Sequence, residues 1–475
     1  MSRSSVLLLA CCLPLTLLAQ SLPAPATAPP PVSASADPPA QQALEAWLEA
    51  FNSGERARME AYRDRYQPGM DLDAWMDFRA GTGGFRLVRG EASDGGKARA
   101  LLQELESDTV ARVEVTPQPD GSMQVGVQAI SPPDDLRVPR MAQEAALDAL
   151  VAKADAQAAQ DAFSGVLLVA QGDEVLLQRA WGEADRAAGA PVAPDTKFRI
   201  GSMNKMFTAV AALQLVQAGR LSLDGSVGQY LPGYPNAGVA KATIRQLLTH
   251  SGGTGDIFGP QFDAQRLSLR THDDYVRLYG ARDPTHPPGQ EQRYSNYGFL
   301  LLGAIIERVT GQSYYDYVDA HVFAPAGMRD SGSLPEDVAV PGRAVAYRRE
   351  DGAWVDAADT LPYRGTAAGG GYSTAGDLLK FARALRSGEL LSPALLAEAT
   401  RNQTPWYGLG FMTREEEGVR VYGHAGGAQG MNGELRIYPS LDRVVVGLAN
   451  VDPPAVERLV GHYVLRMPAT PAPVD

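Results

Sequence analysis

A serine and a lysine three positions apart form the first pattern in this sequence that could carry chemistry. Ser202-Met203-Asn204-Lys205 opens a stretch with helical spacing of apolar residues, which ends near Gly219. Because three residues make nearly one helical turn, the side chains of Ser202 and Lys205 would share a face. There the lysine could take the serine proton or stabilise the alkoxide. The spacing alone is a weak signal, and Lys205 could equally be a solvated helix residue.

A tyrosine and an asparagine before a second apolar run could complete such a site. Tyr294-Ser295-Asn296 follows a Pro-Pro-Gly turn and precedes a long apolar stretch typical of a buried helix. If Tyr294 faces Lys205, the ammonium would stabilise its phenolate, and the tyrosine could act as a general base. Asn296 could donate a hydrogen bond to a substrate carbonyl. The alternative is that Tyr294 only packs in the loop.

A histidine followed by small residues is the third pattern. His424-Ala425-Gly426-Gly427 lies shortly before two predicted strands near the C-terminal end. Small residues there would let a substrate backbone approach the strand, although a lone histidine is more often structural than catalytic. The six histidines show no metal-ligand spacing. We therefore expect no metal site and no other cofactor.

The composition of the chain limits the classes of partner. Of its 475 residues, 45% are hydrophobic and 21% charged, as in globular proteins, and the length suits about two to three domains. The formal net charge of −12 argues against non-specific binding of nucleic acids. We expect a small-molecule or peptide substrate, and the oligomeric state stays open.

The N-terminal residues are typical of a targeting segment. Arg3 precedes the apolar run Val6–Ala19, which is shorter than the roughly 20 residues that span a bilayer. We expect a secretory signal peptide at 1–26, and hence secretion to the periplasm or the extracellular space. A buried N-terminal helix and a lipid anchor at Cys11 are the alternatives, and no other segment predicts a transmembrane helix. Pro/Ala-rich composition predicts a linker at 27–40 and a short tail at 468–475.

Residues 41–140 are expected to form a small α+β domain. Apolar residues have helical spacing over 41–66, with a break at 52–54. Alternating or apolar segments predict strands at 85–88, 111–115 and 123–127. In this pattern the segment resembles the cone-shaped SnoaL-like domains. No residues within it form a chemical constellation, so an accessory packing domain is the favoured interpretation.

Residues 141–467 are expected to form a second, larger domain. The residue pattern predicts helices at 141–162 and 453–466, and a mainly helical middle from 200 to about 400. Predicted strands lie at both ends of this domain, at 163–170, 175–177, 434–438 and 444–448. Strands on either side of a helical middle imply one sheet assembled from distant parts of the chain.

Taken together, the three chemical patterns resemble those of class C β-lactamases and penicillin-binding proteins, in the order Ser-x-x-Lys, Tyr-Ser-Asn and Lys/His-x-Gly. The resemblance extends over about 160–465 and includes further segments around these patterns: Phe198-Arg199-Ile200-Gly201, Ile244 to Gly253, Val309-Thr310-Gly311, Ala326-Gly327-Met328 and Gly369 to Thr374. It implies an α+β fold, with a β-lactamase/transpeptidase-like antiparallel sheet flanked by helices and a mainly helical subdomain.

The resemblance also implies roles for individual residues. Ser202 would be the acylated nucleophile, and Lys205 and Tyr294 would share proton transfer. The backbone N–H groups of Ser202 and Gly427 would form the oxyanion hole. Substrate would be bound by the three residues Asn296, His424 and Gly426.

One departure from the family pattern bears on the substrate. His424 stands where β-lactamases and penicillin-binding proteins commonly carry a lysine, and histidine is mostly neutral at pH 7. Binding of carboxylate-bearing β-lactams should therefore weaken. The resemblance implies a serine hydrolase of ester or amide bonds, with D-amino-acid peptides among the candidates and weak β-lactamase activity. The alternative is a non-catalytic binding or scaffolding member of the fold.

Overall fold

The computed structural model describes residues 39–350, 352–416 and 418–469. The predicted signal peptide, Cys11 and most of the predicted linker and tail lie outside these ranges. Helix α1 begins at Pro39, so the last two residues of the predicted linker belong to it. The described residues form two compact units that divide after Pro139.

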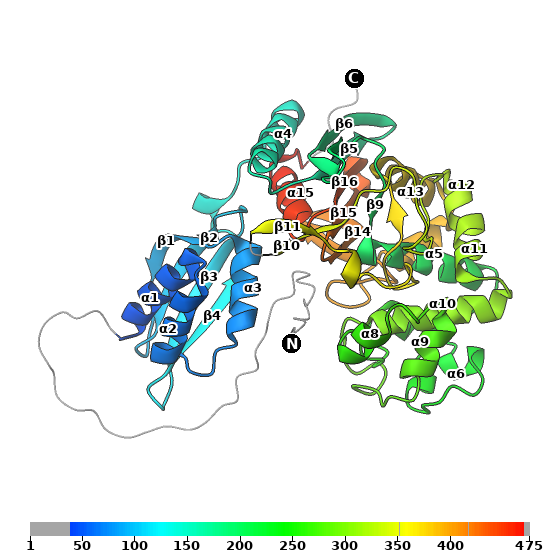
Figure 1. Cartoon of the computed structure of the whole chain (residues 1–475), viewed down its shortest axis with the longest axis horizontal. Helices are drawn as coiled ribbons and strands as arrows, with labels where there is room; N and C mark the ends of the chain where they lie inside the picture. The colour runs from blue at the N-terminus through cyan, green and yellow to red at the C-terminus, as the bar shows by residue number, and fades with distance from the viewer. Residues whose placement is uncertain (1–38, 351, 417, 470–475) are drawn as a thin grey trace, which may run out of the picture. The chain divides into compact units, whose positions relative to one another are not determined.

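The first unit consists of three helices followed by a four-stranded antiparallel sheet in the order β1-β2-β3-β4 (Figure 1). The predicted helical region with its break and the three predicted strands are confirmed, while α3 and β2 lie outside the predicted elements. The elements are α1 (Pro39–Ser53), α2 (Arg56–Tyr66), α3 (Leu72–Thr82), β1 (Phe85–Glu91), β2 (Ala98–Glu104), β3 (Val110–Pro117) and β4 (Met123–Ala129).

Aromatic side chains hold the helices of this unit to its sheet. Trp47 and Phe51 of α1 stack with ring centres 5.0 Å apart, and Phe85 of β1 lies 5.5 Å from Phe51. All three are buried, and burial of such large rings contributes much of the free energy that stabilises a hydrophobic core. This core gives the unit its own hydrophobic interior.

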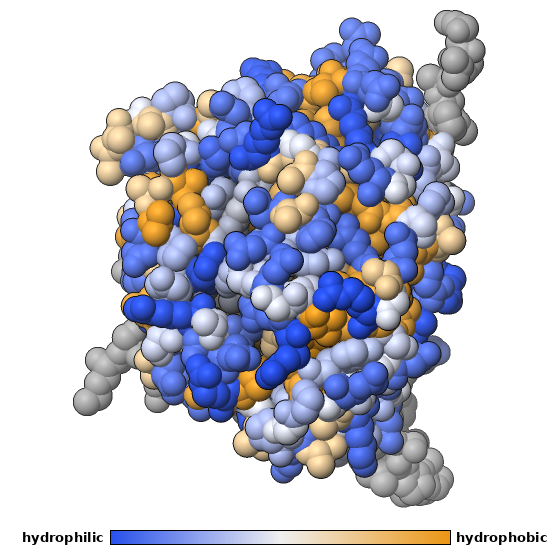
Figure 2. Space-filling model, turned by 90° about the vertical axis from the view of Figure 1, so that its right-hand side faces the viewer, coloured by the Kyte–Doolittle hydropathy of each residue, from blue (hydrophilic) through white to orange (hydrophobic). Residues whose placement is uncertain are grey.

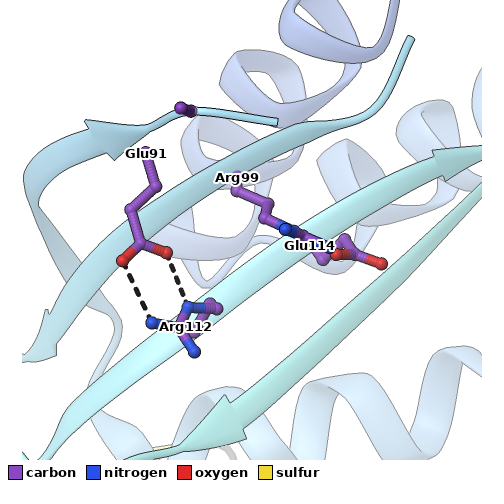
Figure 3. A pocket seen from close by; sticks show the side chains of 5 residues that line it. Glu91, Arg99, Arg112 and Glu114 are labelled. Carbon is purple, nitrogen blue, oxygen red and sulfur yellow. Dashed lines mark hydrogen bonds and ion pairs between the residues drawn. The ribbon is translucent and has the colours of Figure 1, made fainter. Parts of the chain in front are cut away.

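Charged side chains line a hollow on the sheet of the first unit, shown in Figure 3. Arg112 donates to both carboxylate oxygens of Glu91, at 2.6 and 3.0 Å, and Glu114 pairs with Lys97 and Arg99. These side chains are partly exposed, where ion pairs contribute little free energy. The hollow is therefore lined by cations and carboxylates that already satisfy one another.

The second unit is built on a six-stranded antiparallel sheet in the order β13-β14-β15-β16-β5-β6. Strand β5, near the start of the unit, pairs with β16 near its end, with Val166 opposite Leu448. The prediction of one sheet from distant parts of the chain is confirmed. The strands are β5 (Gly165–Gln171), β6 (Glu174–Trp181), β13 (Met412–Glu416), β14 (Val419–Ala428), β15 (Met431–Tyr438) and β16 (Arg443–Ala449).

Helices cover both faces of this sheet (Figure 1). Helices α4 (Gln143–Ala159) and α15 (Ala455–Arg466) pack in one core with Leu167 and Val445, and both helices agree with predicted segments. The neighbouring residues of β5 and β16 point into the opposite core, which holds α5 (Asn204–Gln217) and α13 (Ala375–Ser387). Because both faces are covered, β16 is buried along its whole length, and its residues after Arg443 form a continuous apolar run.

The region between the two parts of the sheet is mainly helical, as predicted. Its helices are α5 (Asn204–Gln217), α6 (Val227–Tyr230), α7 (Ile244–Leu248), α8 (Pro260–Gln265), α9 (His272–Tyr279), α10 (Asn296–Thr310), α11 (Tyr314–Val318), α12 (Ala324–Ala326), α13 (Ala375–Ser387) and α14 (Pro393–Ala399). Three short strands precede these helices, β7 (Glu183–Asp185), β8 (Ala190–Pro191) and β9 (Phe198–Arg199). Three more lie between α12 and α13: β10 (Tyr347–Glu350), β11 (Ala353–Asp356) and β12 (Tyr372–Ser373).

The surface carries scattered apolar residues. On the face drawn in Figure 2, hydrophobic residues lie in separate patches between hydrophilic ones, as is normal on protein surfaces. Within the described ranges, no helix is both long enough and apolar enough to cross a membrane.

Candidate active site

The predicted nucleophile lies in a tight turn that leads into a helix. Gly201–Met203 forms a 3-10 turn, and α5 begins directly after it at Asn204. Gly201 has a φ of +52°, a conformation that residues with a Cβ rarely adopt. Ser202 therefore precedes the helix that it was expected to open, because the backbone turns sharply at this glycine.

Lys205 lies in the first turn of α5 with none of its surface exposed. Its Nζ lies 3.3 Å from Ser202 Oγ and donates to Asn296 Oδ1 at 2.7 Å and to the carbonyl oxygen of Ala368. With two N–H groups so directed, the nitrogen can donate a third N–H to Ser202 Oγ. As a neutral amine, it can accept the serine proton instead. The prediction that Ser202 and Lys205 share a face is confirmed.

Asn296 is the first residue of α10 and contacts Lys205 with one end of its amide. Ser295 caps this helix, because its hydroxyl accepts from the backbone N–H of Gly298 at 2.9 Å. The Asn296 Nδ2 group donates to the Asp256 carboxylate, at 3.0 Å to Oδ1 and 3.2 Å to Oδ2. Lys205, Asn296 and Asp256 thus form a continuous chain of hydrogen bonds.

Tyr294 lies against Lys205 with the face of its ring. Lys205 Nζ is 4.7 Å from the ring centre of Tyr294, within cation–π range, and the phenol oxygen is shielded from solvent. The structure therefore brings Tyr294 and Lys205 together, which was the condition set for a role of the tyrosine in proton transfer.

His250 stacks on Tyr294 and fixes the loop before α10. The two ring centres are 4.2 Å apart, and the backbone N–H of Ser295 donates to His250 Nδ1 at 3.1 Å. Burial and, next, the nearby charge of Lys205 hold the pKa of His250 well below its usual value. His250 is therefore neutral and acts on the site through its packing and this hydrogen bond.

His424 lies in β14 and is 2% exposed. Its Nδ1 faces the carbonyl oxygen of Ala425, and its Nε2 lies 2.8 Å from the hydroxyl of Tyr407. A carbonyl can only accept, so Nδ1 donates to it and Nε2 accepts from the Tyr407 hydroxyl. Burial and the charge of Lys205 lower the pKa of His424 to about 3. The ring is therefore neutral, with both nitrogens engaged inside the protein.

The glycines after His424 let β14 lie directly against the nucleophile turn. A Cβ on Gly426 would come within 2.0 Å of the Ile200 carbonyl oxygen and 2.9 Å of the Ser202 nitrogen. A Cβ on Gly201 would come within 3.0 Å of the Gly427 nitrogen. The two backbone segments that carry the predicted oxyanion donors, at Ser202 and Gly427, are thus neighbours only because both sides carry glycine.

A buried hydrogen-bond network fixes the carbonyl that Lys205 contacts. The backbone N–H of Ala367 donates to His272 Nε2 at 3.1 Å, while His272 Nδ1 lies 3.0 Å from Glu307. Thr208 donates to the Ala367 carbonyl oxygen at 2.7 Å. These bonds hold the segment next to Ala368, and so position an acceptor for Lys205.

Sequence reasoning did not identify Asp256, Tyr407 or Ala368 as parts of the site. Ala368 acts through its backbone carbonyl, which leaves no mark in the sequence. Asp256 and Tyr407 act through Asn296 and His424, so only the fold reveals them. His250 lies in one of the segments that carry the family resemblance, but no role was assigned to it.

The residues of the site are suited to acid–base and nucleophilic catalysis. In the described part of the chain, no three His, Cys, Asp or Glu side chains are grouped so that they could hold a metal ion. A buried lysine beside a serine, with fixed acceptors for the lysine, is suited to activating that serine as a nucleophile.

Comparison with known proteins agrees with this chemistry. Esterase EstB of Burkholderia gladioli is 35% identical over 283 residues, which cover 52% of this chain and 71% of the esterase. The structure of a penicillin binding protein from Bacillus halodurans has a TM-score of 0.60 at 31% identity and covers 65% of this chain and 99% of its own. That of D-amino acid amidase from Ochrobactrum anthropi SV3 has a TM-score of 0.58 at 25% identity and covers 67% of this chain and 97% of its own.

The family is shown by a match that spans most of the second unit. The model described as Beta-lactamase matches residues 147–466, and the neighbours include esterase, penicillin-binding protein and amidase members. The predicted β-lactamase/transpeptidase-like fold is confirmed, and the chain is an enzyme of the serine hydrolase type. This chain belongs to the Beta-lactamase family.

Proposed function

We propose that this enzyme cleaves ester or amide bonds through an acyl-enzyme on Ser202. The observation that carries the proposal is the 3.3 Å separation between Ser202 Oγ and the buried Lys205 Nζ. Lys205 takes the serine proton as Oγ attacks the substrate carbonyl, and a C–O bond to Ser202 forms. The leaving group then departs with a proton, and water releases the acyl group in a second step.

Tyr294 and the backbone N–H groups complete the proposed mechanism. Tyr294, in contact with Lys205, shares proton transfer to and from Ser202 and the leaving group. The N–H groups of Ser202 and Gly427 stabilise the oxyanion of the tetrahedral intermediate. Gly426 borders the bound substrate, whereas Asn296, predicted to donate to a substrate carbonyl, has its amide engaged by Lys205 and Asp256 and acts through Lys205.

Simple esters are the proposed substrates in preference to β-lactams. His424, in the position where β-lactamases and penicillin-binding proteins commonly carry lysine, is neutral because burial and Lys205 lower its pKa to about 3. A neutral ring gives no cation to bind the carboxylate of a penicillin. The similarity to Esterase EstB supports this preference. A D-amino-acid amide or peptide is the second candidate, supported by the similarity to a D-amino acid amidase.

The test is intact-protein mass spectrometry after exposure to a fluorophosphonate, a penicillin and a p-nitrophenyl ester. We expect an adduct on the wild type and none on Ser202→Ala, with the ester turned over faster than the penicillin is bound. Ser202→Ala should unfold at the same temperature as the wild type. This control shows that the missing adduct reflects the missing nucleophile and not an unfolded protein. A folded wild type that takes no label from any reagent would favour a non-catalytic binding member of the fold.

We further propose that residues 41–140 form a SnoaL-like accessory domain. The three helices and the four-stranded antiparallel sheet of the first unit support this proposal.

We also propose that the enzyme is exported. The signal-like residues 1–26 support export, with secretion to the periplasm or the extracellular space. Mass measurement of the mature protein tests both the cleavage site and the alternative of a lipid anchor at Cys11. A mature mass that retains the N-terminal residues would contradict the proposal.

A further inference from the structure

The amide of Asn296 faces two partners with opposite requirements. Its Oδ1 accepts from Lys205 Nζ at 2.7 Å, and its Nδ2 donates to Asp256 Oδ1 at 3.0 Å and Oδ2 at 3.2 Å. An ionised carboxylate accepts hydrogen bonds and donates none. If the amide rotated by half a turn, its NH2 would face the lysine and its oxygen would face the carboxylate. Both contacts would then be unfavourable.

Asp256 is itself held in place by the backbone around it. Its Oδ1 accepts from the backbone N–H of Ile257 at 2.7 Å and from that of Asn296 at 3.3 Å. Arg282 donates to the Asp256 carbonyl oxygen at 2.7 Å. With its main chain and Oδ1 fixed, the carboxylate presents both of its oxygens to the Asn296 NH2 group.

We propose that Asp256 is a positioning residue, which fixes the Asn296 amide so that its oxygen faces Lys205. This inference rests on the proposed function of Ser202. With Asn296 Oδ1 and the Ala368 carbonyl as acceptors, two N–H groups of Lys205 are directed away from the serine. The remaining position on Nζ points to Ser202 Oγ, whether it holds a proton or a lone pair. Asp256 therefore orients Lys205 through Asn296, without itself contacting the substrate or the serine.

Two substitutions at one position separate this role from a merely structural one. In Asp256→Asn the oxygen can keep its bonds to the backbone N–H groups and to the Asn296 NH2, while the new NH2 takes the place of Oδ2 and opposes that NH2. One favourable and one unfavourable contact then exist in either orientation of the Asn296 amide, so position 256 no longer selects the orientation. Asp256→Ala removes both contacts and also selects neither orientation.

The experiment measures the acylation rate of the full chain with a p-nitrophenyl ester, together with thermal unfolding of each variant. We expect Asp256→Asn to acylate about 10- to 100-fold more slowly than the wild type, as for loss of a charge-assisted hydrogen bond. Asp256→Ala should acylate at least as slowly, and KM should change less than kcat in both variants. A merely structural role predicts the wild-type rate for Asp256→Asn, because asparagine has the shape of aspartate. A folded Asp256→Asn that acylates as fast as the wild type would therefore overturn the inference.

An exchange of the two side chains gives a second test that does not depend on the folding of Asp256→Asn. In the double variant Asp256→Asn/Asn296→Asp, the carboxylate at position 296 accepts from Lys205, as the Asn296 amide oxygen does in the wild type, and the amide at position 256 donates to that carboxylate. It should acylate faster than Asn296→Asp alone, in which two carboxylates face each other. An exchanged pair no faster than that single variant would contradict the inference. Absence of acylation in the wild type would instead contradict the proposed function.

Discussion

Replacing Gly426 by alanine tests how closely the glycine strand and the nucleophile turn must fit. The added Cβ would lie 2.0 Å from the Ile200 carbonyl oxygen and 2.9 Å from the Ser202 nitrogen, whereas ordinary contacts begin at 3.4 Å. Both neighbours are backbone atoms, so neither can move aside by rotation of a side chain. The two segments must separate by about 1.4 Å to bring the 2.0 Å approach to ordinary contact. A displacement of about 1 Å already costs about 100-fold in rate when it misplaces catalytic groups.

The separation should act on the transition state more than on substrate binding. The predicted oxyanion donors lie on the two segments that move apart, at Ser202 and Gly427. Loss of one such donor lowers kcat by about 100- to 1000-fold. We expect Gly426→Ala to lower kcat for a p-nitrophenyl ester by about 100-fold or more with a smaller change in KM.

A matched glycine supplies the control. Gly461 lies in α15, and a Cβ there would meet no atom within 4 Å, so Gly461→Ala should keep the wild-type rate. Steady-state kinetics and thermal unfolding of both variants would be measured together. A folded Gly426→Ala enzyme with wild-type kcat would refute the reasoning, as would an equal loss of activity in Gly461→Ala.

Three further predictions concern buried polar groups. Tyr407→Phe leaves His424 Nε2 without the hydroxyl 2.8 Å away, so thermal or urea unfolding should show a loss of about 1–3 kcal/mol; an unchanged stability would argue against this bond. His424→Lys should raise the rate of penicillin labelling seen by mass spectrometry and lower the melting temperature, because it adds a second cation near Lys205; an unchanged or slower rate would contradict it. Burial raises the pKa of Glu457 from 4.5 to about 7, so the folded state holds this proton more tightly than the unfolded state, and stability falls as pH rises between these values. Glu457→Gln should remove that part of the fall, giving a higher melting temperature than the wild type at about pH 8 but not at about pH 4; equal pH profiles would count against it.

Local patterns in the sequence predicted most of the fold. The helical region of 41–66 with its break, and the strands that begin and end the second unit, follow from periodicity alone. Helix α3 and strand β2 could not be recognised in the same way. Helix α3 buries only the residues at its two ends, Leu72 and Thr82, so its sequence lacks an apolar stripe.

Strand β14 shows where such reasoning stops. It contains Gly423, Gly426 and Gly427, and glycine is unfavourable in strands. Its conformation is imposed by pairing with β13 and β15 and by the approach of the nucleophile turn. These contacts join residues distant in sequence, so a local pattern cannot predict them.

In the candidate site, too, some residues could be predicted from local sequence and others only from tertiary contacts. The side chains of Ser202, Lys205 and Asn296 could be named from motifs, and the structure brings all three together. Asp256 and Ala368 could not, since one acts through another side chain and the other through its backbone. Motifs thus identify groups placed to react with substrate, whereas the groups that orient them emerge only from tertiary structure.

The pairing of β5 with β16 has a consequence for the order of synthesis. During translation, the β5–β6 hairpin forms early, but its other neighbour in the sheet lies more than 250 residues later, since Val166 pairs with Leu448. The central sheet of the second unit therefore cannot close until nearly the whole chain has left the ribosome. A chain that terminates before Arg443 would lack a central strand rather than a peripheral one, and the surface of β15 that pairs with β16 would stay open. A late premature stop should therefore yield an insoluble fragment instead of a slightly shortened enzyme.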